Sequence, residues 1–221
     1  MGKFYSSKLY ALAVMLYRLM LLNILTVVCS IPVFTAGPAL CGLYGAVYNM
    51  LKEQGSVVGD FFGNFKKCFK RSVGHLLLFL LLAAIASVNI YAERTYLSSE
   101  FSFIVMVFTI LILVACLFTA AYIFPLLPHF RAPFLQSIRI ALFFAFKYLP
   151  RTIIIVILNL LPWVLLYFST HAFVMILPVW GLLAFSVIAC INTKLLRPVI
   201  EEMNEALEEQ EREEAAEREE A

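Results

Sequence analysis

Charged residues are scarce in this chain. They make up 14% of its 221 residues, against about 25% in ordinary soluble domains. Aspartate and glutamate are absent from all of its long apolar runs. Carboxylates inside membrane helices form the proton relays of many pumps, so their absence argues against a proton-coupled transporter.

The chain also lacks the short motifs of common catalytic and cofactor sites. It has no GxxxxGK[ST] phosphate loop, no HExxH zinc motif and no GxSxG nucleophile turn. The histidines His75, His129 and His171 are isolated, and the five cysteines form no CxxC pair. We therefore predict no enzymatic activity, no cofactor and no metal site, and we interpret the cysteines as small buried hydrophobic residues.

Apolar sequence is present in excess. Hydrophobic residues make up 62% of the chain, the mean hydropathy is +0.90, and runs of about 20 apolar residues indicate transmembrane helices. We predict an all-α membrane protein with about six transmembrane helices, the first of them retained and not cleaved as a signal peptide. These are expected at Leu9–Ile31, Pro38–Leu51, Val73–Ala92, Phe103–Phe124, Thr152–Thr170 and Phe173–Leu195.

Two segments beside these runs are basic and rich in aromatic residues, Asp60–Arg71 and Pro133–Arg151. In the first, phenylalanines fall on one arc of a helix and lysines on the other. We predict two cytoplasmic interfacial helices that lie on the anionic lipid of the inner leaflet. The alternative role for the first is docking of an acidic partner.

The basic residues indicate the orientation. With six spans, fifteen of the 17 lysines and arginines fall in cytoplasmic pieces, while Arg94 is external and Arg18 lies inside a span. The positive-inside rule then places both termini in the cytoplasm, and we expect a bacterial plasma-membrane location. This orientation accounts for the basic charge, so no nucleic-acid partner is predicted.

An acidic tail follows the last predicted span. Residues 201–221 contain eleven acidic residues and two arginines, whereas residues 1–200 contain fifteen basic and four acidic residues. We predict a six-span membrane domain over residues 1–200 and a solvated, helix-prone cytoplasmic tail over residues 201–221.

Prolines and glycines gather between the first two predicted spans. Pro32 is expected to end the first span, Thr35 or Gly37 suits a helix N-cap, and Pro38 suits the first turn of the next helix. The favoured interpretation is a tight structural turn. The alternative is a half-buried helix N-terminus whose free N–H groups bind an anion or a polar ligand.

The helix that starts there is short and carries small residues. Pro38–Leu51 has only fourteen residues, about 21 Å of helix. Ala39, Gly42 and Ala46 share one face, and small side chains let a neighbouring helix approach closely. We therefore predict that Gly42 packs against another span.

Five polar residues inside or beside the spans are candidate functional positions. Each could hydrogen-bond to another helix or line a polar path. Arg18 could reach the cytoplasmic surface or pair with a buried polar group such as Asn23. The five positions are Arg18, Asn23, Thr35, Asn159 and Asn192.

Three segments resemble the YesL family of bacterial membrane proteins over roughly residues 5–200. They are IPVFTAGPALCGLY after a span with Asn23, FFGNFKKCFKRS before the next span, and FPLLPHFRAPFLQSIRIALFFAFKYLPRTIII at Phe124–Ile155. The chain departs from the family pattern at His129–Phe130–Arg131, where a basic residue, phenylalanine and an acid are expected. The resemblance implies a protein of unknown activity whose relatives are often encoded near carbohydrate transporters of the ATP-binding-cassette (ABC) type.

We therefore expect a non-enzymatic accessory or regulatory partner of a carbohydrate uptake system. The alternative is a small channel or transporter that moves a polar solute itself, with the five polar positions lining its path.

Overall fold

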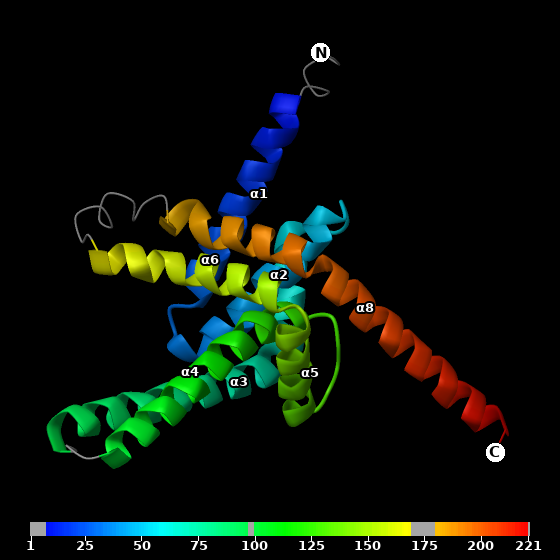
Figure 1. The fold of residues 1–221 in the computed structure, drawn as a ribbon. Coiled ribbons are helices and arrows are strands. Elements are labelled where there is room, and N and C mark those ends of the chain that lie inside the picture. The colour runs from blue at the N-terminus through cyan, green and yellow to red at the C-terminus, as the bar shows by residue number, and fades with distance from the viewer. Residues whose placement is uncertain (1–7, 97–99, 169–179, 221) are drawn as a thin grey trace.

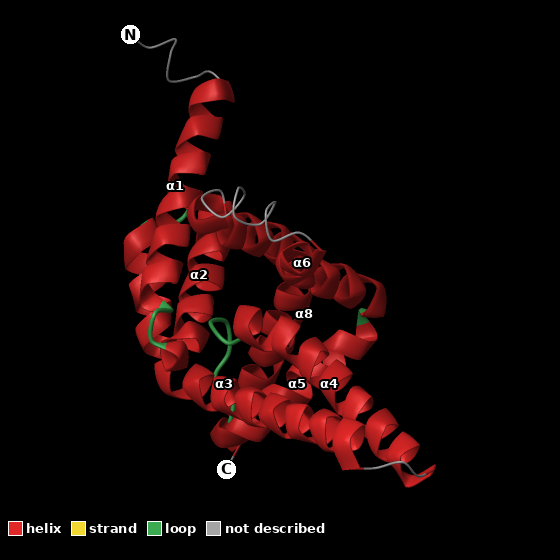
Figure 2. Cartoon of the chain, turned by 90° about the vertical axis from the view of Figure 1, so that its left-hand side faces the viewer, coloured by secondary structure: helices red, strands yellow, loops and turns green. Residues whose placement is uncertain are grey.

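The computed structural model describes residues 8–96, 100–168 and 180–220, and these ranges are helical throughout apart from short connections (Figures 1 and 2). The elements in chain order are α1 (Lys8–Cys29), the 3₁₀ turn η1 (Val33–Thr35), α2 (Ala36–Leu51), α3 (Val57–Tyr96), α4 (Glu100–Leu126), α5 (Phe134–Lys147), α6 (Leu149–Phe168), the π-helix η2 (Trp180–Ala184) and α8 (Phe185–Glu220). The expected all-α architecture is confirmed.

Helix α2 lies at the centre of the molecule. It packs against α1, α3, α4 and α8, and twelve of its sixteen residues are buried. The helix has no charged residue, and its glycines and alanines let its neighbours approach. Two clusters of buried side chains form around it, one including Tyr122 and Leu196 and the other including Leu22 and Phe61.

Helix α3 is continuous over 40 residues, about 60 Å. Asp60–Arg71 therefore does not form a separate interfacial helix, because it runs directly into the apolar segment that follows. No proline interrupts the chain there, so the change from an amphipathic to an apolar pattern alters the surroundings of the helix but does not end it.

The second predicted interfacial segment is divided in the structure. Helix α5 ends at Lys147, and α6 begins at Leu149 after a bend of 106°. Pro150 lies in the first turn of α6, where a missing N–H costs little. The buried Thr152 hydroxyl donates to the carbonyl of Ala145 at 2.7 Å across the bend.

Within the described ranges, four helical segments are long and apolar enough to cross a bilayer, and the bent pair α5–α6 would add a fifth. The four are Tyr10–Cys29, Val57–Ala92, Ile104–Leu126 and Gly181–Ala206. Only 11% of the most apolar stretch of α3 or α4 is buried inside the protein. Exposed apolar surface of this extent is expected to contact lipid. The predicted second span is α2, which is too short to be counted.

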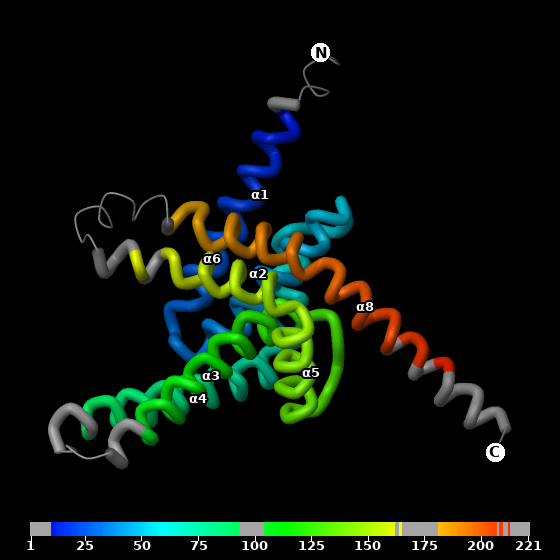
Figure 3. Tube along the Cα trace, viewed as in Figure 1, coloured from blue at the N-terminus to red at the C-terminus, as the bar shows by residue number. Residues whose placement is uncertain are grey.

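The C-terminal helix α8 passes through Pro198 without a break and reaches Glu220. It packs against α2 and α6, and its coloured turns beyond these contacts extend away from the other helices (Figure 3). The predicted boundary at residue 200 between the membrane domain and the acidic tail stays a prediction. The start of the predicted sixth span, Phe173, lies outside the described residues.

Candidate functional site

Asn23 joins α1 to the start of α8. Its Nδ2 donates to the carbonyl of Gly181 at 2.5 Å, and its Oδ1 accepts from the backbone N–H of Ser186 at 3.0 Å. The two backbone groups are five residues apart, and a π-helical hydrogen bond would connect a carbonyl and an N–H at this spacing. The fully buried amide of Asn23 bridges them at the π-helix η2, which is the arrangement of a packing contact and not of a ligand site.

Asn192 and Asn159 lie together with Tyr44. Asn192 Nδ2 is 3.1 Å from the Tyr44 hydroxyl and 3.4 Å from Asn159 Oδ1. Asn159 also donates to the carbonyl of Ile155 at 2.8 Å in its own helix. Asn192 is fully buried, and its Oδ1 has no hydrogen-bond partner among the described residues. We call Tyr44, Asn159 and Asn192 the polar cluster.

A pocket of about 260 Å³ adjoins the polar cluster between α2, α4 and α6. Tyr44 and Asn159 are its polar lining residues. The rest of the lining is apolar, namely Leu40, Leu117, Ala120, Ala121, Phe124, Pro125, Val156 and Leu160. The pocket could hold a small, mostly apolar molecule with one hydrogen-bonding group.

Sequence reasoning missed Tyr44. The available signal was that a tyrosine inside a small-residue helix needs a partner for its hydroxyl when it is buried. Its position on α2 gave no indication of which helix would supply that partner.

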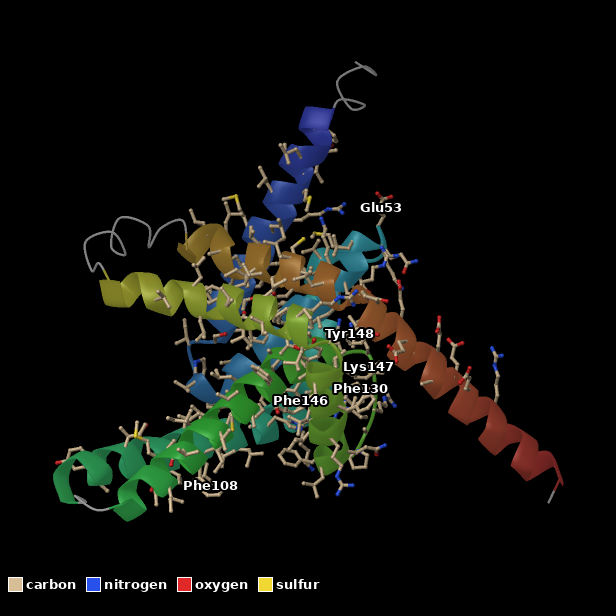
Figure 4. All side chains as sticks on the ribbon, viewed as in Figure 1. Glu53, Phe108, Phe130, Phe146, Lys147 and Tyr148 are labelled. Atoms are coloured by element: carbon tan, nitrogen blue, oxygen red, sulfur yellow. The ribbon has the colours of Figure 1, made fainter. Side chains whose placement is uncertain are left out.

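Arg18 lies apart from the polar cluster and does not hydrogen-bond to Asn23. It is exposed and lines a groove of about 530 Å³ beside Met50, Leu51 and Glu53. Glu53 is labelled near the α2–α3 connection in Figure 4. Since the groove is at the end of α2 and its lining includes a carboxylate, Arg18 is not isolated in apolar surroundings.

The turn before α2 differs from the prediction in one respect. Thr35 occupies the N-cap position, but its side chain makes no capping hydrogen bond. Its hydroxyl lies 2.6 Å from the carbonyl oxygens of Cys29 and of Pro32. It therefore bonds to the last carbonyl of α1, and the predicted cap to α2 is wrong. Pro32 is in an extended conformation just after α1, and Pro38 lies in the first turn of α2.

Gly37 and Gly42 are the places where α2 closely approaches the backbone of α3. A Cβ at Gly37 would lie 2.7 Å from the carbonyl oxygen of Ser72, and one at Gly42 would lie 2.9 Å from that of Phe61. Both distances are shorter than an ordinary van der Waals contact. The glycines therefore allow the two helices to pack in this register.

The basic face of α3 holds the connection between α4 and α5. Lys67 Nζ donates to the carbonyl of Pro128 at 2.7 Å, and Arg71 Nη1 donates to that of Phe130 at 2.9 Å. His75 Nε2 lies 3.3 Å from the carbonyl oxygen of Phe134. Lys67 and Arg71 come from the segment Asp60–Arg71 that was expected to lie on lipid, and these two of its four cations instead bind backbone carbonyls of the protein.

His129, in the same connection, packs edge-on against Tyr48 with 4.3 Å between the ring centroids. Burial, together with the positive charges of Lys67 and Lys52, lowers the pKa of His129 to about 4. Its imidazole is therefore neutral near pH 7. The structure brings no group of three His, Cys, Asp or Glu side chains together over the described ranges.

Comparison with known proteins gives one match. A family model described as a protein of unknown function, DUF624, matches residues 19–90. No curated protein and no solved structure matches the chain. The matched residues cover the second half of α1, all of α2 and most of α3, which include Asn23, Thr35 and the glycines of the α2–α3 contact.

Proposed function

We propose that this multi-pass membrane protein is a non-enzymatic accessory or regulatory partner of a carbohydrate uptake system of the ABC type in the bacterial plasma membrane. The observation that supports a role other than transport is how the asparagine side chains within the helices are bonded. Asn23, Asn159 and Asn192 bond to helices or to one another. The pocket beside them is lined mostly by apolar residues, which is unlike a path for a polar solute.

The sugar-uptake part rests on the resemblance to the YesL family. It can be tested by deleting the gene and measuring growth on single sugars while the candidate ABC transporter remains expressed. We expect slower growth on the sugar of that transporter, and co-purification of its membrane subunit with the tagged chain. Normal growth on every sugar together with no co-purification would contradict the proposal.

The exposed cations of α3 are the proposed contacts to anionic lipid or to an acidic partner. Lys66 and Lys70 are exposed, whereas Lys67 and Arg71 hold the α4–α5 connection. Replacing Lys66 and Lys70 by glutamine should weaken binding to anionic lipid by about 1 kcal/mol per charge, or reduce co-purification of an acidic partner protein. The melting temperature should stay unchanged. The paired change at Lys67 and Arg71 should lower stability as well.

A second candidate is a transporter or channel, which the two polar side chains in the otherwise apolar lining of the pocket favour. Tyr44 and Asn159 would then contact the solute. Uptake of labelled sugars by proteoliposomes that contain the purified chain alone tests this function. If the chain takes up sugar and Asn159→Leu abolishes the uptake, the transporter function is supported and the accessory role is rejected. If uptake is no faster than in empty liposomes, the transporter function is rejected and the accessory role stands.

Six crossings with both termini in the cytoplasm are part of the proposal. In Figure 1 the α1–α2 connection, the C-terminal end of α6 and the paired ends of α3 and α4 lie on the left, while the α2–α3 connection and α5 lie on the right. In a cysteine-free background, a cysteine at Ser98 should react with an impermeant thiol reagent in intact cells, and a cysteine at Ser56 should not. External labelling of the Ser56 variant would contradict this orientation.

A further inference from the structure

A small basic pocket lies where the C-terminal end of α2 meets α8. Its volume is about 140 Å³. The side chains that line it are Tyr48, Leu51, Lys52, Thr193, Lys194 and Arg197. Three of these six side chains carry a positive charge. Lys52 directly follows α2, and Lys194 and Arg197 of α8 are more than 140 residues further along the chain.

The positive charges are only partly neutralised. Arg197 Nε pairs with Glu201 at 2.8 Å, and no interaction among the described residues uses the Nη atoms of Arg197. Lys52 Nζ lies 4.5 Å from the centre of the Tyr48 ring, and Lys194 forms no ion pair within the described part of the chain. Lys52 also stabilises the negative end of the α2 dipole, but this does not explain the two cations of α8.

Tyr48 supplies a second and independent feature. It is 7% exposed, and its hydroxyl is a buried donor with no hydrogen-bond partner among the described residues. An unpaired buried hydroxyl costs free energy, so buried tyrosines usually have a partner. Here the hydroxyl belongs to a residue that lines a pocket with three cations, and an anion would supply the acceptor.

We propose that this pocket binds a phosphate group, carried either by the headgroup of an anionic phospholipid or by a soluble phosphorylated molecule. Arg197 would donate from its Nη atoms in the forked geometry that suits phosphate oxygens, and the two lysines would add point charges. The Tyr48 hydroxyl would donate one further hydrogen bond. Basic pockets between membrane helices bind lipid phosphates in this way.

Two probes distinguish the sources of the phosphate. The purified full-length chain is melted in inorganic phosphate and in chloride at equal ionic strength. Separately, native mass spectrometry counts phosphatidylglycerol retained from mixed micelles with phosphatidylcholine. Stabilisation by inorganic phosphate indicates a soluble ligand, and retention of one phosphatidylglycerol without that stabilisation indicates a lipid.

Variants decide whether binding occurs in this pocket. Arg197→Gln should weaken binding roughly 10- to 100-fold, and Tyr48→Phe roughly 2- to 10-fold, as expected for charged and neutral hydrogen bonds. Arg212→Gln is the matched control, because Arg212 pairs with Glu208 at the same spacing on α8, outside the pocket. The proposal is overturned if neither probe binds, or if Arg197→Gln binds as well as Arg212→Gln does. The assay measures no sugar uptake, so its result is independent of the growth test.

Discussion

Replacing Gly42 by alanine tests the contact between α2 and α3 on which the fold depends. The added Cβ would lie 2.9 Å from the carbonyl oxygen of Phe61 and 3.1 Å from two of its ring carbons. The obstacle includes the backbone of a neighbouring helix, which cannot rotate out of the way as a side chain can. The two helices must therefore separate by a few tenths of an ångström.

The magnitude follows from two opposing effects. Overpacking of a tight contact costs about 1–3 kcal/mol, while alanine is favoured over glycine inside a helix by about 1 kcal/mol. Gly63 provides the matched control, since it lies inside α3 and a Cβ added there would have no atom within 4 Å. Gly63→Ala should gain the helix propensity alone, so the two variants should differ by about 1–3 kcal/mol, the packing cost.

Thermal unfolding in detergent measures this difference. For a chain of this length 1 kcal/mol corresponds to about 2–4 °C, so Gly42→Ala should melt about 2–12 °C below Gly63→Ala. Gly42→Leu should melt lower still. Equal melting temperatures for the two alanine variants would refute the close approach of α2 to α3.

Three other perturbations test contacts between the remaining elements. Asn23→Leu removes both hydrogen bonds to the start of α8 and should cost about 1–2 kcal/mol in thermal unfolding, whereas an unchanged melting temperature would contradict the bridge. His129 has a folded pKa of about 4, below its unfolded value of about 6.5. The unfolded state therefore binds the extra proton first, and the wild type should lose about 3 kcal/mol of stability as the pH falls from about 6.5 to about 4. His129→Gln should lack this component, and identical pH profiles for the two proteins would exclude it. Finally, Cys41 of α2 and Cys68 of α3 are buried in the same cluster of side chains. A variant that keeps only these two cysteines should form an intramolecular disulfide under mild oxidation, detected by mass spectrometry, and no cross-link would argue against this register.

The strongest local patterns in the sequence located the helices. The first span was expected at Leu9–Ile31 and α1 covers Lys8–Cys29, while the fourth was expected at Phe103–Phe124 and α4 covers Glu100–Leu126. Long apolar runs that end near proline constrain helix boundaries on their own. The continuous α3 was missed because amphipathic and apolar stretches are both helical, and the sequence between them contains no break.

The polar cluster and the basic face of α3 could not be found in this way. Asn159 and Asn192 were both candidates, but their partnership depends on how α6 and α8 pack. Lys67 and Arg71 had the spacing of a lipid-facing arc, and their actual acceptors are carbonyls about 60 residues away. A backbone carbonyl has no residue-specific signal, so only the tertiary structure could reveal these contacts.

The number of crossings depends on α2, which we expect to cross the membrane although it is short. Its sixteen residues span about 24 Å, less than the roughly 30 Å hydrocarbon core. Twelve of them are buried against other helices, so α2 contacts little lipid, and its length need not match the lipid thickness. Its two ends lie on opposite sides of the molecule in Figure 1.

We therefore expect reporter fusions at both ends of the chain to be cytoplasmic, as six crossings require. If α2 instead enters and leaves on one side, the bent pair α5–α6 still crosses once and the count falls to five. The two termini would then lie on opposite sides of the membrane, with Lys3 and Lys8 outside against the positive-inside rule. A periplasmic N-terminal reporter combined with a cytoplasmic C-terminal reporter would establish that arrangement and reject the crossing of α2.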